Sequence, residues 1–271
     1  MRDQSVDYIV VGAGSAGCVL ANRLSADPAT HVLLLEAGGR DRNPWIHIPV
    51  GYFKTMLNPK TDWCYQTEPD PGLNGRSIPW PRGKVLGGSS SINGMCYVRG
   101  HALDYDRWAG NALPEWSYAH VLPYFKRMET WEKGADAYRG GSGPLHITAA
   151  NSQDPLFEAY DAAAQSAGLP RNPDYNGARQ VGVGYFQRTI HKGRRMSAAR
   201  AFLRPAMTRS NLEVHTDAQA TGILLEGRRA VGVAYARGGP GGAEVQPAVP
   251  SRIGERPTRY RKPGFDRPRE E

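Results

Sequence analysis

Two short apolar runs near the N-terminus frame a stretch with helical spacing. The first run covers Val6–Val11, and the second, His31–Leu35, leads directly into Glu36. Between them, apolar residues recur at helical intervals until Asp27-Pro28 interrupts the pattern. Near-continuous apolar strands are typical of a buried parallel sheet. The pattern therefore predicts a strand, a helix and a second, parallel strand.

The rest of the chain predicts shorter elements. Gly38–Pro81 has no long periodic element, which is unusual in a compact domain unless the segment is functional. Helices are predicted over residues 117–132, 154–167 and 197–203, the last with Ser197 as its N-cap. Strands are predicted over 145–148 and 185–189, and a small antiparallel meander over 212–216, 221–225 and 230–236, with a turn at Gly227. The predicted fold class is α/β.

The composition changes after residue 237. Residues 238–271 contain six glycines, six prolines and seven lysines or arginines, and their few large apolar residues show no period. Such a segment buries too little surface to offset the entropy lost on ordering. We therefore expect a disordered C-terminal tail.

Composition and charge exclude several classes of protein. The 271 residues carry a net charge of +8, but basic and aromatic residues do not interleave as in RNA-binding proteins, so we expect no nucleic-acid partner. Three cysteines without a C-x-x-C pair argue against a disulfide framework or a cysteine zinc site, and we expect no metal. No apolar run is long enough for a transmembrane segment. Since the first apolar run lacks the features of a signal peptide, we expect a cytoplasmic location.

The turn between the first strand and the helix reads G-x-G-x-x-G. Gly12 permits the tight turn, Gly14 lets a pyrophosphate approach the backbone, and Gly17 lets the helix pack against the strand. The helix N-terminus offers free N–H groups to phosphate. Glu36 lies 19 residues after Gly17, where an acid can accept hydrogen bonds from ribose hydroxyls. The pattern predicts a dinucleotide site and leaves NAD and FAD open, whereas the acid disfavours NADP.

A second glycine-rich segment runs from Arg82 to Met95. Its glycines allow the backbone to lie against a flat ligand, and its serines can cap a helix that points at phosphate. A mobile linker is the alternative interpretation. The apolar residues spaced through the segment argue against it: Val85, Leu86, Ile92 and Met95.

Together these motifs resemble the glucose-methanol-choline (GMC) oxidoreductases, and within them the choline dehydrogenase-like alcohol dehydrogenases. The resemblance rests on Asp7–Cys18, on Leu35–Gly38 and above all on Gly83–Asp106, and it continues at Arg195–Ala199, Asn211–Val214 and Ala230–Val233. It implies hydride transfer from an alcohol to FAD, with an electron acceptor that the sequence does not identify.

The resemblance also implies which residues hold FAD. The implied cofactor-binding residues are Gly12, Gly14, Ser15, Ala16, Gly17, Glu36, Ala37, Gly83, Val85, Gly88, Ser89, Asn93, Gly94, Met95, Cys96 and Ala220. Some family members attach FAD through a histidine where this chain has Ile92, so we expect non-covalent FAD.

The chain departs from the family in its second half. Family members are considerably longer, and their catalytic histidine lies toward the C-terminus. The resemblance therefore implies an N-terminal portion with no catalytic residue of its own, followed by a tail that suggests a frameshift or a misplaced gene boundary. His101 is the best candidate for a base among the seven histidines. Asp104 and Asp106 lie near Arg99 and Arg107 in the sequence and are interpreted as a solvated ion-pair group in preference to an acid/base dyad.

The expected domains are a Rossmann-like FAD-binding domain over 1–150, rejoined by 197–237, a partial α+β substrate-binding domain over 151–196, and the tail over 238–271. Three other functions stay open. They are a non-catalytic FAD- or nucleotide-binding fragment, an NAD-binding module of another class, and a basic nucleic-acid or scaffold protein that uses the tail.

Overall fold

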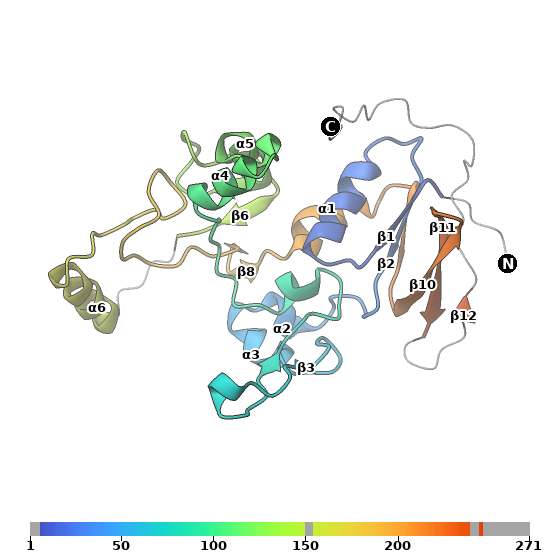
Figure 1. The fold of residues 1–271 in the computed structure, drawn as a ribbon, viewed down its shortest axis with the longest axis horizontal. Helices are drawn as coiled ribbons and strands as arrows, with labels where there is room; N and C mark the ends of the chain where they lie inside the picture. The colour runs from blue at the N-terminus through green and yellow to red at the C-terminus, as the bar shows by residue number, and fades with distance from the viewer. Residues whose placement is uncertain (1–5, 150–153, 239–243, 246–271) are drawn as a thin grey trace, which may run out of the picture.

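The first two strands of the chain belong to a three-stranded parallel sheet (Figure 1). The computed structural model describes residues 6–149, 154–238 and 244–245. The sheet has the order β1 (Tyr8–Val11), β2 (Val32–Leu35) and β9 (Leu212–His215). Every residue of β2 is buried, because strands flank it on both sides and side chains cover both faces. The predicted strand–helix–strand unit is confirmed, with α1 (Ser15–Leu24) between the strands.

The third strand of this sheet corrects the sequence prediction. Residues 212–216 were predicted to join the antiparallel meander, but β9 pairs in parallel with β2. The amide group of Asn211 explains the register, since it donates hydrogen bonds to the carbonyls of Ser25, Asp27 and Thr30. These three bonds fasten the start of β9 to the turn that follows α1.

The antiparallel meander starts after β9. It comprises β10 (Ala218–Glu226), β11 (Arg229–Arg237) and β12 (Glu244–Val245), with Gly227 in the turn at a φ of +59°. Two residues expected in the disordered tail, Glu244 and Val245, thus form a strand. Residues 239–243 and 246–271 of the predicted tail lie outside the described residues.

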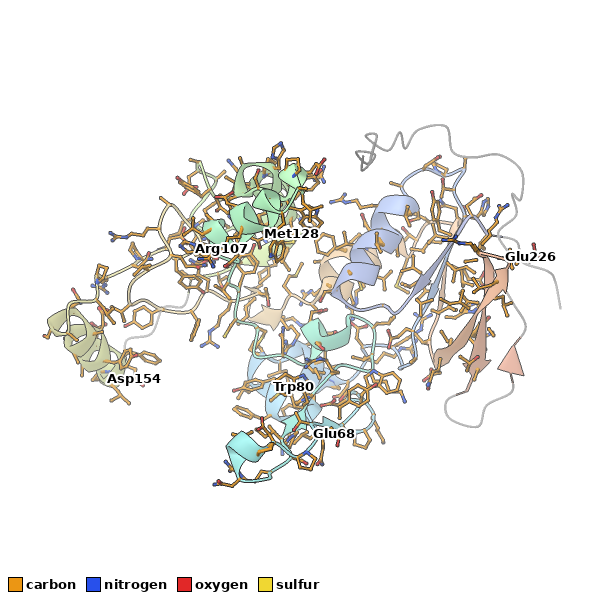
Figure 2. The ribbon with its side chains drawn as sticks, viewed as in Figure 1. Glu68, Trp80, Arg107, Met128, Asp154 and Glu226 are labelled. Carbon is orange, nitrogen blue, oxygen red and sulfur yellow. The ribbon has the colours of Figure 1, made fainter. Side chains whose placement is uncertain are left out.

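The segment 38–81 contains only short elements, as predicted. A buried carboxylate, Asp62, replaces the hydrogen bonds of regular structure by accepting the N–H groups of Leu57, Cys64 and Arg82. The elements between the first sheet and residue 91 are α2 (Pro44–His47), η1 (Pro49–Gly51), α3 (Tyr52–Thr55), β3 (Tyr65–Gln66), η2 (Pro71–Leu73), β4 (Pro79–Trp80) and η3 (Gly88–Ser91). Glu68 and Trp80, labelled in Figure 2, mark this segment.

The middle of the chain forms a second group of elements. They are α4 (Ala102–Gly110), η4 (Pro114–Trp116), α5 (Tyr118–Met128), β5 (Glu129–Trp131), β6 (Leu145–Ile147), α6 (Pro155–Ser166), β7 (Ile190–His191) and β8 (Arg194–Arg195). Figure 1 shows α6 at the end of the molecule remote from β1 and β2, and Figure 2 labels Asp154 at its start. No helix among the described residues is long and apolar enough to cross a bilayer.

Several predicted elements of this group need correction. The helix predicted over 117–132 ends at Met128, because the next residues pair with β6 as a parallel strand. Residues 185–189 are irregular, although Arg188 bridges to both Cys96 and Thr148. The helix α4 was not predicted at all.

The helix predicted over 197–203 is present with altered bounds. It comprises a π-helical turn, η5 (Ala199–Leu203), followed by α7 (Arg204–Ala206). Ser197 behaves as predicted, since its hydroxyl accepts the N–H of Arg200.

A buried ionic network holds the middle group together. Glu129, which is fully buried, accepts hydrogen bonds from Arg99 at 2.6 Å and from Arg139 at 2.9 Å. Arg139 also pairs with Asp174 at 2.7 Å. Because Arg99 and Arg139 each have a carboxylate partner, the cost of removing their charges from water is offset. The network ties the segment around Arg99 to β5 and to residues 174–187.

Replacement of Glu129 tests this network. Glu129→Gln leaves two buried guanidinium groups without their shared carboxylate, so we expect a loss of about 3–5 kcal/mol in the free energy of unfolding. Urea denaturation would measure it. The control, Glu115→Gln, alters an exposed residue of η4 and should change stability by less than about 0.5 kcal/mol. A Glu129→Gln protein as stable as the control would show that the network does not hold the group together.

Candidate dinucleotide-binding site

The first glycine turn has the geometry that its sequence predicts. Gly12 follows β1 with a φ of +90°, and its N–H donates to the carbonyl of Leu35 at 2.7 Å. A Cβ atom on Gly17 would lie 1.9 Å from the carbonyl oxygen of Gly12, so only glycine permits this helix–strand packing. By contrast, a Cβ on Gly14 would meet nothing within 4 Å. The turn is therefore tightly packed where Gly17 meets Gly12, and it is open at Gly14.

The N-terminus of α1 lies at this open side. Gly14 is the N-cap residue of the helix and has no side chain to cap it. The first N–H groups of an α-helix lack partners within the helix and attract anions. Ser15 and Ala16, in the first turn, are exposed. The turn can thus receive a phosphate through backbone groups.

The second glycine segment lies directly against the first. The N–H of Gly87 donates to the carbonyl of Ala13 at 2.7 Å, and a Cβ on Gly88 would lie only 2.8 Å from Cα of Gly14. A Cβ on Gly83 would in turn clash with the backbone of Gly88 at 2.2 Å. Gly87 and Gly88 have φ values of +91° and +53°, which favour glycine. Two segments distant in sequence therefore meet through backbone alone.

Glu36 lies between the two turns. Its carboxylate accepts the N–H of Ala13 at 2.8 Å and that of Gly38 at 2.9 Å, and the residue is only 5% exposed. Burial raises the pKa of Glu36 above its ordinary value, and the two amide hydrogen bonds oppose this shift in part. The bonds fix the carboxylate at the end of β2, next to the first glycine turn.

A groove of about 460 Å³ runs between these features. Nine of the predicted site residues line it: Gly12, Gly14, Ser15, Glu36, Ala37, Gly83, Gly88, Ser89 and Ala220. Its wall also includes residues that the sequence analysis missed: Val11, Leu35, Trp63, Arg82, Ala218 and Gln219. The remaining predicted residues do not line it: Ala16, Gly17, Val85, Asn93, Gly94, Met95 and Cys96.

Trp63 and Arg82 give the groove an aromatic and cationic wall. Lys84 places its Nζ 4.4 Å from the centre of the Trp63 ring, and Tyr65 stacks on that ring at 5.7 Å. The aromatic residues of the irregular segment and the two basic residues that follow it, Arg82 and Lys84, were the available signal. Only the return of the chain at Arg82, fixed by Asp62, brings them to the groove.

The predicted flavin-side residues form a fixed turn next to the groove. Val85 is buried with Ile46 and Ile92 in a small apolar cluster. Met95 has a φ of +63°, and its N–H donates to the side-chain oxygen of Asn93 at 3.0 Å. Because Asn93 and Cys96 are exposed while Met95 is buried, the turn offers polar and sulfur atoms on its open side.

A larger cavity lies elsewhere. It measures about 850 Å³ and is lined by residues of α6 and of the segment 169–187, including Phe157, Tyr160 and Phe186. None of the predicted site residues lines it. Its walls lack the glycine turns, the helix N-terminus and the buried acid, so the smaller groove is the candidate site.

The side chains considered for acid–base chemistry, those of His101, Asp104 and Asp106, accept hydrogen bonds from backbone N–H groups. His101 caps α4 by accepting the N–H of Leu103, and Asp104 accepts the N–H of His101. Asp106 accepts the N–H of Tyr118, and Arg99 pairs with Glu129. The interpretation of Asp104 and Asp106 as an ion-pair group is therefore wrong. Among the described residues, no group of three or more His, Cys, Asp or Glu residues could hold a metal.

Comparison with known proteins agrees with this geometry. The family model described as GMC oxidoreductase matches residues 6–250. Human mitochondrial choline dehydrogenase is 49% identical over 245 residues, 88% of this chain and 41% of that protein. Oxygen-dependent choline dehydrogenase of Photobacterium profundum is 50% identical over 235 residues, 86% of this chain and 41% of that protein.

Solved structures show the same fold. Pyridoxine 4-oxidase from Mesorbium loti superposes with a TM-score of 0.83 at 36% identity, covering 89% of this chain and 48% of that one. An FAD-dependent oxidoreductase from Chaetomium thermophilum gives 0.82 at 30% identity, covering 91% and 44%. The chain belongs to the GMC oxidoreductase family, and it spans about two-fifths of the length of the curated relatives it matches.

The relatives do not support one compartment for the family. The human and mouse proteins are named as mitochondrial, whereas the names of the bacterial ones give no compartment. A cytoplasmic location of this chain therefore stays a prediction from its sequence.

The raised pKa of Glu36 predicts a pH-dependent stability. The folded protein binds this proton more tightly than the unfolded chain, so the carboxyl stabilises the fold below about pH 4.5. That stability is lost as the pH rises through the raised pKa, by at most about 1.4 kcal/mol per pH unit. Glu36→Gln should remove this slope, as urea denaturation between pH 4 and 7, without cofactor, would show.

Glu226→Gln is the matched control for this experiment. Glu226 is exposed at the end of β10, as its label in Figure 2 shows, and its replacement should leave the pH profile parallel to that of the parent. A Glu36→Gln profile that also runs parallel to the parent would contradict the assigned effect of burial.

Proposed function

We propose that this chain binds FAD in the groove between its two glycine segments. We further propose that it forms the FAD-binding part of an oxidoreductase that transfers a hydride from an alcohol carbon to the flavin. One observation carries the proposal: Gly88 abuts Gly14, so that only backbone separates the two segments where the groove passes the N-terminus of α1 and Glu36. This geometry suits a ligand with a pyrophosphate and a ribose.

The residues around the groove suit successive parts of FAD. The pyrophosphate is assigned to Gly12, Gly14, Ser15, Ala16 and Gly17, the ribose to Glu36 and Ala37, and the adenine to the backbone of Ala220. The second glycine segment, with Gly83, Gly88 and Ser89, closes the other side. The flavin end is assigned to Val85 and to Asn93, Gly94, Met95 and Cys96.

We propose FAD, and not NAD, because the chain belongs to the GMC oxidoreductase family and a solved structure that it resembles is named as an FAD-dependent oxidoreductase. The second glycine segment supplies backbone for the second half of such a dinucleotide. It contacts the first turn and continues into the fixed turn at Asn93–Cys96. Non-covalent binding is favoured because Ile92 is apolar and buried with Val85 and Ile46, so it offers no nucleophile. Bound FAD supplies the redox chemistry, while the residues of this chain bind and orient it.

A domain division follows from this assignment. We propose that residues 1–150 and 197–237 form the FAD-binding part, which the pairing of β9 with β2 supports. Residues 151–196 are proposed as part of a substrate-binding domain, in keeping with the position of α6 away from the parallel sheet (Figure 1).

The proposed substrate is a small alcohol, because the most similar curated relatives include proteins named choline dehydrogenase. Alcohol oxidation needs a base within reach of the hydroxyl proton. Within the part of the chain that the structure describes, no histidine lines the groove, and His101 is engaged as a helix cap. We therefore expect this chain to bind FAD and to turn over alcohols weakly or not at all, which keeps a non-catalytic FAD-binding fragment as the second candidate.

Flavin absorbance tests the proposal directly. The purified chain, incubated with FAD and desalted, should retain the absorbance of bound flavin. Choline with an artificial electron acceptor should then give little or no turnover. Loss of all flavin on desalting would overturn the proposal, and rapid turnover would contradict the missing base.

Gly14→Asp tests the pyrophosphate position. The new side chain faces the open groove, where its carboxylate would repel the pyrophosphate, so the Kd for FAD should rise at least tenfold, or about 1.4 kcal/mol. Aspartate is a favoured N-cap residue, so the variant should stay folded. Fluorescence titration with FAD would measure the effect.

Gly110→Asp supplies the control for charge and size. Gly110 ends α4, and a Cβ there also meets nothing within 4 Å, but the residue does not line the groove. Its FAD affinity should equal that of the parent. Equal affinities for Gly14→Asp and the parent would show that the pyrophosphate binds elsewhere.

A further inference from the structure

Arg195 is a buried cation without an anionic partner. Its residue is only 1% exposed, and among the described residues it makes no ion pair. The other two buried arginines, Arg99 and Arg139, share the carboxylate of Glu129. An unpaired buried charge is costly and is seldom kept without compensation. Arg195 is thus the exception in a protein that otherwise pairs its buried arginines.

The guanidinium of Arg195 binds neutral oxygens only. Its Nε donates to the carbonyl of Ile46 at 2.7 Å, and its Nη1 donates to the carbonyl of Ser90 at 3.1 Å and to the side-chain oxygen of Asn93 at 2.9 Å. Its Nη2 is buried and has no hydrogen-bond partner. Desolvation lowers the pKa of Arg195 to about 10, which still leaves it charged at neutral pH.

These contacts lie beneath the turn assigned to the flavin. Asn93 receives both the guanidinium and the N–H of Met95, so Arg195 braces the left-handed conformation of Met95. Ser90, its second acceptor, directly follows Ser89 in the wall of the groove. The hydroxyl of Ser90 also accepts the N–H of Ala198, which binds the same turn to the chain beyond β8.

We propose, on the basis of the proposed FAD site, that Arg195 is a positioning residue for the flavin end of FAD. It holds the turn from Ser90 to Asn93 and supplies there a positive charge that the protein leaves uncompensated. Bound FAD that had taken up a hydride would carry one more negative charge than the oxidised form, because a hydride brings two electrons and one proton. A fixed cation nearby lowers the energy of that charged form.

Two variants separate the bracing from the charge. Arg195→Gln removes the charge, so the preference of the site for reduced over oxidised FAD should fall at least tenfold, or about 30 mV for a two-electron couple. Arg195→Lys keeps the charge but cannot reach all three acceptors, so its potential should stay near that of the parent while its Kd for FAD rises about tenfold. Reductive titration of the FAD-bound full chain against a reference dye, and fluorescence titration, give the two values.

Arg171→Gln is the matched control. Its side chain is 59% exposed and pairs with Asp161 away from the groove, so neither the potential nor the Kd should change. If Arg195→Gln folds and has the reduction potential of the parent, the proposed effect of the charge on reduced FAD is overturned. A purely structural residue would alter stability and affinity only. If Arg195→Gln does not fold, Arg195→Lys provides the test. A Kd for FAD equal to that of the parent would overturn the proposal that Arg195 holds the turn from Ser90 to Asn93. A raised Kd with an unchanged potential would support the proposal.

Failure of the proposed function would look different. In that case the parent itself retains no FAD, whatever residue occupies position 195. A parent that binds FAD, with variants of unchanged potential and affinity, refutes the inference on Arg195 alone.

Discussion

The close backbone approach of Gly88 to Gly14 is the constraint on which the rest of the structure depends. Any side chain at Gly88 would occupy the space of Gly14, so the two turns can meet only as bare backbone. Their meeting fixes the second glycine segment over α1 and beside Glu36. The apolar cluster beneath Val85 and the brace at Arg195 then hold the far end of that segment. The shape of the groove, the position of Glu36 beside it and the position of the turn at Asn93–Cys96 therefore all depend on this one backbone contact.

The local features of the site could be predicted from the sequence because their physical causes are local. A positive φ at Gly12 and the clash beneath Gly17 follow from the turn itself. The placement of Glu36 follows from its position at the end of an apolar strand. The sequence also indicated that the second glycine segment is no linker, since buried residues such as Ile92 alternate with its glycines. The family resemblance, which the comparisons confirm, connected the two segments.

Features set by distant contacts could not be predicted. The pairing of β9 with β2 depends on the amide of Asn211 reaching the turn after α1, which no periodicity reveals. Trp63 and Arg82 reach the groove only because Asp62 returns the chain to it. The unpaired charge of Arg195 was equally hidden, because a sequence does not show which arginines find carboxylates. In each case one polar side chain joins segments that the pattern treats as separate.

Asp62 also separates the loop of residues 65–81 from the groove, so that a change in the loop need not alter the groove. Its carboxylate accepts the N–H groups of Cys64 and Arg82, and so holds together the two ends of the loop formed by residues 65–81. We expect that this loop can change in length or composition while the chain still enters the second glycine segment at the same point. Changes in the outer loop are thereby separated from the geometry of the groove, because one carboxylate holds both ends of the loop.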